Sequence, residues 1–177
     1  MAYKQRKVRK WHNTAILLFI LYLIGLTYFL FFAPFLGRTG DETFYLNGLP
    51  LYGEYNLSPF KVIRLFVFNM DKVPFHMFFL NIFGNVLCFM PFGFLLKAAT
   101  GNKLPFGLCV LAAVGTSIGF EFLQYYFAVG VGDIDDVILN TTGAALGYLV
   151  YYTILRAVRR KNKSALRQAQ GTKRESE

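Results

Sequence analysis

The chain has 177 residues, of which 55% are hydrophobic, 18% aromatic and only 16% charged. Soluble domains are about one quarter charged, so this composition excludes a disordered chain, a collagen-like chain and a disulfide scaffold. The formal net charge of +9 fits either a nucleic-acid-binding protein or a protein at a membrane surface, and the positions of the charges decide between them.

Four apolar segments are long enough to cross a bilayer. A hydrocarbon core of about 30 Å requires about 20 helical residues, and the stretches that meet this requirement are 14–36, 73–96, 104–129 and 136–156. The apolar run of the first is longer than that of a cleaved signal peptide and lacks a clear cleavage site, so we interpret it as an uncleaved anchor. The sequence therefore predicts an all-α membrane protein, with a four-helix membrane domain over residues 14–158.

The basic residues predict the orientation of these helices. Fifteen of the 19 Lys and Arg residues lie before the first span, between the second and third, or from the last residue of the fourth, Arg156, onwards. Since such residues concentrate on the cytoplasmic side of a membrane, we expect both termini to be cytoplasmic and a long external loop, 37–72, to join the first two spans. Residues 1–13 and 159–177 are then basic cytoplasmic tails, of which the second is expected to be disordered.

The same charges also indicate the partners. They flank hydrophobic spans and do not form a face with interleaved aromatic residues, so no nucleic-acid partner is expected. Their expected roles are retention on the cytoplasmic side and contact with anionic membrane lipids. A homo-oligomer is compatible with the sequence.

Polar residues interrupt the last three spans at a similar depth, in the outer half of the membrane. They are Asn81 and Asn85 in the second span, Ser117, Glu121 and Gln124 in the third, and Asp133, Asp135, Asp136 and Asn140 at the start of the fourth. An unpaired polar group in hydrocarbon costs several kcal/mol, so these side chains should face the interior of the bundle. We therefore predict an outward-opening polar cleft between the second, third and fourth helices.

Each of these residues also has a purely structural interpretation. Buried amides commonly join transmembrane helices, and aspartates commonly cap a helix N-terminus. Such a cap explains one or two of the three acids, which leaves Asp135 or Asp136 to turn towards Glu121. Glu121 is the strongest functional candidate, because an ionisable group inside a span marks a site by default. A divalent cation at Asp135 and Asp136 is a weaker alternative, and no resident cofactor is predicted.

The external loop contains a start signal for a short helix. Ser58 is suited to the N-cap position and Pro59 to the first helical turn. The helix that follows is too short to span the membrane, and Lys61 and Arg64 lie on one of its faces. It fits either an interfacial helix directed to head groups or a lid over the bundle, and both interpretations place it beside the cleft.

Small residues recur every fourth position in the last two spans. Gly115 and Gly119 lie in the third span, and Gly143 and Gly147 in the fourth. This spacing permits close approach of helix backbones. We therefore expect both pairs to lie at helix contacts.

Together these motifs resemble the VanZ-like family over about residues 15–155. The similarity rests on Asn56-Leu57-x-Pro59-Phe60, Asn81-x-x-x-Asn85, Phe89-x-Pro91-x-Gly93, Ser117-x-x-x-Glu121-x-x-Gln124 and Asp133-x-Asp135-Asp136-x-x-x-Asn140-x-x-Gly143-x-x-x-Gly147. The resemblance implies a multi-pass protein of the bacterial cytoplasmic membrane and cell envelope, and its founding member is associated with reduced susceptibility to teicoplanin. It implies no particular reaction.

One position departs from the family pattern. Many members carry an arginine just before the aspartate motif, where this chain has Gly130-Val131-Gly132. If that arginine pairs elsewhere with the counterpart of Glu121, then Lys61 or Arg64 could replace it here.

Two classes of function follow. In the first, which we favour, a non-enzymatic protein binds a polar or lipid-linked ligand, such as a cell-wall precursor, in the outward-facing cleft and lowers glycopeptide susceptibility. Lys61 and Arg64 would then meet phosphate groups. In the second, an intramembrane hydrolase or transferase acts on an outer-leaflet lipid, with Glu121 as general acid or base. A small proton-linked transporter is a further alternative.

Overall fold

The computed structural model describes residues 2–32, 45–46, 49–50, 55–69, 75–127 and 132–175. The helices are α1 (Ala2–Phe32), α2 (Lys61–Phe68), α3 (Phe75–Phe79), the π-helix η2 (Leu80–Gly84), α4 (Asn85–Ala99), α5 (Phe106–Tyr126) and α6 (Ile134–Glu175). The strands have two residues each and are β1 (Tyr45–Leu46), β2 (Leu49–Pro50), β3 (Tyr55–Asn56) and β4 (Gly132–Asp133).

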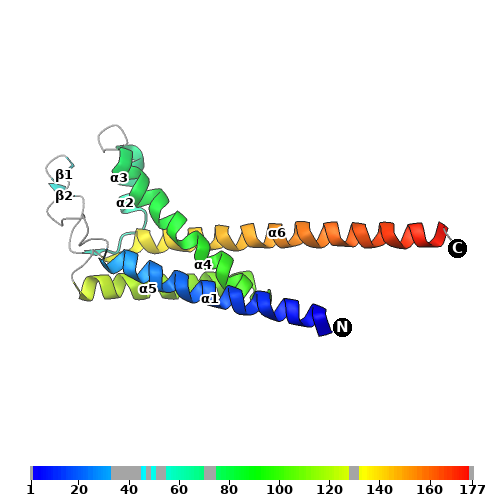
Figure 1. The fold of residues 1–177 in the computed structure, drawn as a ribbon. Coiled ribbons are helices and arrows are strands. Elements are labelled where there is room, and N and C mark those ends of the chain that lie inside the picture. The colour runs from blue at the N-terminus through cyan, green and yellow to red at the C-terminus, as the bar shows by residue number, and fades with distance from the viewer. Residues whose placement is uncertain are drawn as a thin grey trace.

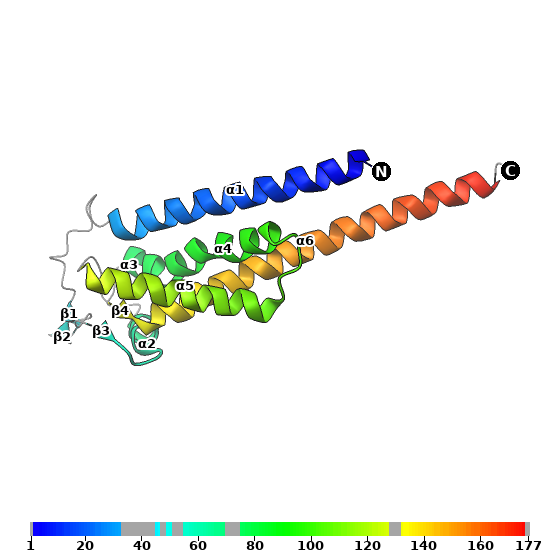
Figure 2. The ribbon, with the colours of Figure 1, turned by 90° about the horizontal axis from the view of Figure 1, so that it is seen from below.

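Four helical segments of the described chain are long and apolar enough to cross a membrane. They are Trp11–Phe32, Leu80–Ala99, Phe106–Tyr126 and Ile134–Ala165, and each overlaps one of the predicted spans. The prediction of four spanning helices is therefore confirmed. Both chain ends emerge at one end of the bundle, called here the terminal end, whereas α2 and the strands gather at the opposite, loop end (Figures 1 and 2). Which end faces the cytoplasm stays a prediction.

Helices α4 and α6 form the central contact of the bundle, and glycine makes this contact possible. A Cβ atom at Gly147 would lie 1.8 Å from the carbonyl oxygen of Met90, and one at Gly143 would lie 2.1 Å from that of Val86. On the α4 side, a Cβ atom at Gly93 would lie 1.8 Å from the carbonyl oxygen of Ala144. The two backbones therefore touch, as the glycine spacing of the fourth span predicts.

The glycine pair of the third span behaves differently. A Cβ atom at Gly115 or Gly119 would meet nothing within 4 Å. The prediction of close approach at these two positions was wrong. They lie on a part of the α5 surface that no neighbouring backbone approaches, so the spacing alone did not identify a contact.

Helix α1 packs mainly on α4. The core shared by the helices contains Leu26, Phe89 and Phe92, and the Tyr22 hydroxyl donates a hydrogen bond of 2.7 Å to the carbonyl oxygen of Cys88. At the loop end, the ring of Phe31 also contacts α5. Packing of apolar side chains, together with this hydroxyl hydrogen bond, therefore helps to hold the first span in place.

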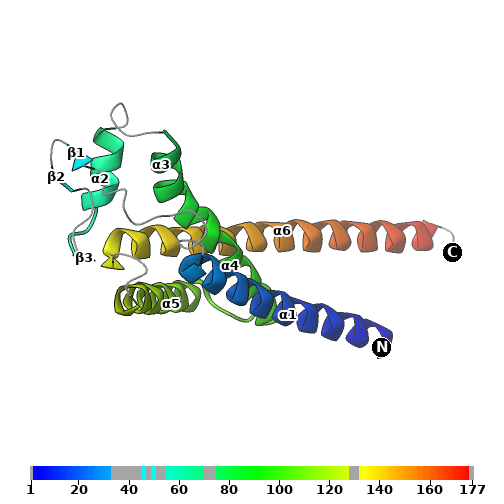
Figure 3. The ribbon, with the colours of Figure 1, turned by 60° about the vertical axis from the view of Figure 1, so that its left-hand side comes forward.

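A short parallel pairing of strands joins the segment before α2 to the start of α6. Strand β3 pairs with β4, with Tyr55 opposite Gly132 and Asn56 opposite Asp133. Figure 3 shows β3, α2 and the first turn of α6 at the same end of the molecule. Strand β1 pairs antiparallel with β2. Strand β3, in the connection between the first two spans, is thus fixed to the start of the fourth.

One sequence expectation about a helix boundary was wrong. Helix α2 begins at Lys61 and not beside Ser58, with Phe60 in the left-handed conformation at its N-cap (φ 63°). Helix α6 continues to Glu175, beyond the end of the predicted fourth span, and the disorder of the tail 159–177 stays a prediction. The tail contains many Arg and Lys residues, which are good helix formers, and it continues an existing helix, so it pays no nucleation cost.

Candidate ligand pocket

A buried aspartate at the start of α6 holds helix α2. The Asp135 side chain is fully buried, with 0% of its surface exposed. One carboxylate oxygen accepts hydrogen bonds from the backbone N–H groups of Val62 and Ile63, at 2.7 and 3.1 Å, and the other accepts one from Phe60. The first N–H groups of a helix have no intrahelical partner and carry partial positive charge, so a carboxylate satisfies them and stabilises the helix.

A second aspartate joins β4 to the loop. Oδ1 of Asp133 accepts a hydrogen bond from Asn56 Nδ2 at 2.7 Å and one from the backbone N–H of Asp135 at 2.8 Å. Asn56 Oδ1 in turn accepts one from the backbone N–H of Ser58. Burial raises the pKa of the Asp133 carboxyl above its ordinary value, and these hydrogen bonds and the positive charge of Lys61 partly oppose that rise.

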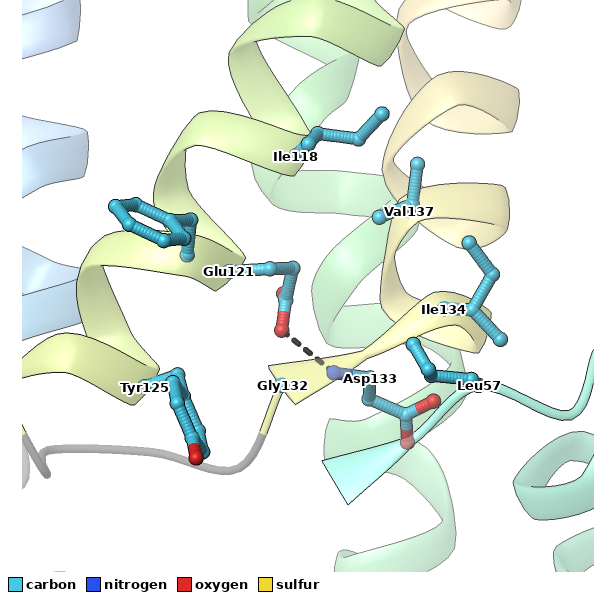
Figure 4. A pocket seen from close by; sticks show the side chains of 9 residues that line it. Leu57, Ile118, Glu121, Tyr125, Gly132, Asp133, Ile134 and Val137 are labelled. Carbon is cyan, nitrogen blue, oxygen red and sulfur yellow. Dashed lines mark hydrogen bonds between the residues drawn. The ribbon is translucent and has the colours of Figure 1, made fainter. Parts of the chain in front are cut away.

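Glu121 reaches the same strand from α5. Its Oε2 atom accepts a hydrogen bond of 2.8 Å from the backbone N–H of Asp133. Figure 4 shows the Glu121 side chain between α5 and the start of α6, where it points towards β4. The glutamate therefore links the third and fourth spans at the loop end.

These contacts border a pocket of about 390 Å³. Its walls are mostly apolar, and the residues that line it are Leu57, Ile118, Glu121, Phe122, Tyr125, Gly132, Asp133, Ile134 and Val137. Glu121 and Asp133 are the carboxylic acids in this lining, and none of the described residues that line it carries a positive charge. Two aromatic residues of the lining are exposed, Phe122 with 64% of its surface and Tyr125 with 53%. Volume and composition are those of a small-molecule or lipid-chain site.

The other predicted site residues form separate contacts between helices and do not join a common cleft. Asn85 Nδ2 of α4 donates to Asp136 Oδ1 of α6, and Asn140 Nδ2 of α6 donates to Ser117 Oγ of α5 at 2.8 Å. Gln124 Nε2 donates to the carbonyl oxygen of Leu30 in α1. The prediction of one polar cleft lined by all of these residues was therefore wrong, because each amide is used to join a pair of helices.

The remaining predicted site residues lie outside the pocket lining. Asn81 is half-buried within η2, while Lys61 and Arg64 are exposed on α2. Among the described residues, no group of three or more His, Cys, Asp or Glu side chains could hold a metal ion. Both oxygens of Asp135 accept N–H groups, and a cation at Asp135 and Asp136 stays an untested alternative.

Sequence reasoning did not identify the pocket walls. Ile118, Glu121, Phe122 and Tyr125 follow the spacing i, i+3, i+4, i+7 and therefore share one face of α5. Such a face, with an acid inside it, was a signal that could have located the pocket. Asn56 was noticed only as part of a motif, and its contact with Asp133 across 77 positions has no local signal.

The fold and the pocket define the class of the protein: a multi-pass membrane protein of four apolar helices with a mostly apolar pocket at the loop end. The family model described as VanZ/LLP1 matches residues 19–156, and the chain belongs to this family. The resemblance identified from the motifs is thereby confirmed.

One curated relative is "Protein VanZ" of Enterococcus faecium, which is 38% identical over 73 residues. The match covers 41% of this chain and 45% of that protein, so it spans less than half of the relative. No solved structure matches the chain.

Proposed function

We propose that the protein binds an amphiphilic, lipid-anchored ligand of the outer leaflet in this pocket, and that this binding lowers susceptibility to glycopeptides such as teicoplanin. The observation that carries the proposal is the pocket itself, where apolar walls on two membrane-spanning helices meet the carboxyl group of Glu121. A hydrocarbon chain fits such walls, and a polar head fits the end where Glu121 and Asp133 lie.

The expected orientation supports an outer-leaflet ligand. The basic residues cluster towards the terminal end, which the positive-inside rule assigns to the cytoplasm. The pocket lies at the opposite end, beside β4 and the loop. A ligand that enters from the outer leaflet would therefore meet the pocket directly.

The contacts of the other polar residues favour binding over catalysis. An intramembrane hydrolase would need groups that assist Glu121 in proton transfer or in stabilising developing charge. Asp135, Asp136 and Gln124 carry groups that could assist in this way, but in the structure each is hydrogen-bonded to another helix. Glu121 thus stands as a binding group in an apolar pocket.

Filling the pocket tests the proposal. Ile118 lines the pocket and is half-exposed, so the larger side chain of Ile118→Trp should occupy the cavity. Leu111 lies two turns earlier on α5, is 65% exposed and does not line the pocket, so Leu111→Trp is the matched control. The variants should be expressed to equal membrane levels in a susceptible host, and the teicoplanin concentration that inhibits growth should be measured.

We expect Ile118→Trp to remove the protection that the unaltered chain gives and Leu111→Trp to retain it. Equal protection by the two variants would refute the pocket as the functional site. A parallel search for a co-purifying amphiphile by native mass spectrometry should find it with Leu111→Trp and not with Ile118→Trp.

A further inference from the structure

The polar surface of the pocket is acidic. Glu121 lies in its lining, and Asp133 lies at its edge with one oxygen engaged by Asn56 and by the backbone of Asp135. Among the described residues, no Lys, Arg or His side chain lines the pocket and none forms an ion pair with Glu121. A carboxylate in an apolar pocket is costly unless a positive group pairs with it.

We propose that the pocket selects amphiphiles whose head group carries a protonated amine, which pairs with the Glu121 carboxylate. This inference rests on the proposed function, because it names the chemical class of ligand that the same pocket takes. The amine neutralises the carboxylate, and the attached hydrocarbon chain occupies the space beside the apolar side chains of Ile118, Ile134 and Val137.

The walls alone give little selectivity in a membrane. A chain that enters the pocket leaves other hydrocarbon and not water, so its burial carries no hydrophobic free energy of the kind gained in aqueous binding. The polar group must therefore supply the preference for one amphiphile over another. In this pocket that group is the carboxyl of Glu121.

Two aromatic rings reinforce the preference for a cation. Phe122 and Tyr125 line the pocket on the same helix face as Glu121. The faces of aromatic rings attract ammonium groups through the ring quadrupole, and an aromatic surface beside a carboxylate is a common way to bind a substituted amine.

An anionic head is disfavoured for the same reason. A phosphate in the pocket would lie beside Glu121 and repel it, whereas Lys61 and Arg64, expected from the sequence to meet phosphate, lie on the exposed surface of α2 outside the lining. Any phosphate of the ligand would have to remain outside the pocket. The amine is the group that enters.

The test compares probes that share one chain and differ in the head. The full chain, purified in an uncharged detergent, is titrated with dodecylamine, dodecanol or dodecyl phosphate, and binding is followed by native mass spectrometry. The amine is protonated at neutral pH. The variants are Glu121→Gln, which keeps an oxygen for the Asp133 N–H, and Glu175→Gln at the far end of α6 as the matched control.

We expect dodecylamine to bind the unaltered chain at least about tenfold more tightly than dodecanol or dodecyl phosphate, as expected for one hydrogen bond to a charged group. Glu121→Gln should abolish this preference but keep dodecanol binding, and Glu175→Gln should change neither. A preference for dodecanol or dodecyl phosphate, or an unchanged amine preference in Glu121→Gln, would overturn the inference.

The Ile118→Trp variant separates this inference from the proposed function. If it abolishes the binding of all three probes, the pocket is the binding site. The comparison of the three head groups then tests this inference separately from the proposed function. If all three probes bind Ile118→Trp as they bind the unaltered chain, the site lies elsewhere and both proposals fail.

Discussion

Replacing Asp135 with asparagine should release helix α2 from the base of α6. The carboxylate accepts three backbone N–H groups, two of them on one oxygen. An asparagine can place its one oxygen towards Val62 and Ile63, but its NH₂ group then faces the N–H of Phe60, and the two donors repel. The substitution also removes the negative charge beside the N-terminus of α2.

The magnitude follows from these contacts. Hydrogen bonds to a charged acceptor contribute about 1.5–3 kcal/mol, against about 0.5–1.5 kcal/mol for neutral ones. A negative charge at a helix N-terminus adds about 0.3–1 kcal/mol. We therefore expect the opening of α2 to become easier by about 2–4 kcal/mol, which corresponds to amide exchange about 30- to 700-fold faster.

Hydrogen–deuterium exchange of the backbone amides of Val62 and Ile63 measures this change. Asp136→Asn is the matched control, because Asp136 is the next residue and accepts a hydrogen bond from Asn85 of α4. The amides of α2 should exchange much faster in Asp135→Asn and little faster in Asp136→Asn. Equal exchange rates in the two variants would show that Asp135 does not hold α2.

Three further outcomes are expected. Gly147→Ala would place a methyl group 1.8 Å from the carbonyl oxygen of Met90 and should lower the free energy of unfolding by about 1–3 kcal/mol. Gly115→Ala, the control, should be neutral or slightly stabilising. Equal thermal stability of the two variants would contradict the α4–α6 contact. A reporter that works only in the cytoplasm should be active when fused at Ser164. Activity of a periplasmic reporter at this position would show that the predicted orientation is wrong. Burial raises the pKa of Asp133 in the folded state. The stability that this group contributes is therefore present below its ordinary pKa and is lost as the pH rises through the raised pKa. Unfolding should become easier from acid towards neutral pH, and Asp133→Asn should flatten this dependence.

The spans and the α4–α6 contact could be predicted from the sequence because their signals are local. An uninterrupted apolar stretch has few folded alternatives in a membrane, since every backbone polar group must be satisfied within the segment. Gly143 and Gly147 were also identified correctly, and their spacing places both on one face of α6. The same spacing in α5 had no partner, which shows that small residues permit an approach without requiring it.

The site was only partly predictable because pairing depends on tertiary contacts. The sequence singled out Glu121 as the strongest functional candidate, and this residue lines the pocket. It could not show that Asp135 faces α2 and Asp136 faces α4, although they are adjacent, because successive helical residues point about 100° apart and a neighbour on each side decides their use. The amides were read as one cluster from depth alone, and depth does not distinguish a shared cleft from separate pairs.

Helix α6 and the strand before it provide hydrogen-bond partners for polar groups of α2, α4 and α5. This arrangement has a consequence for biogenesis. Asn85 of α4, Ser117 and Glu121 of α5, and the amides at the start of α2 all bond to α6 or to β4 just before it. These segments precede α6 in the chain, so during synthesis they reach the bilayer before their partner exists. Until α6 enters, their polar groups face lipid or one another, and the bundle can be completed only by its last span. A chain interrupted before Gly132 would therefore present unpaired polar groups within the membrane, the feature by which quality control can recognise an unassembled membrane protein.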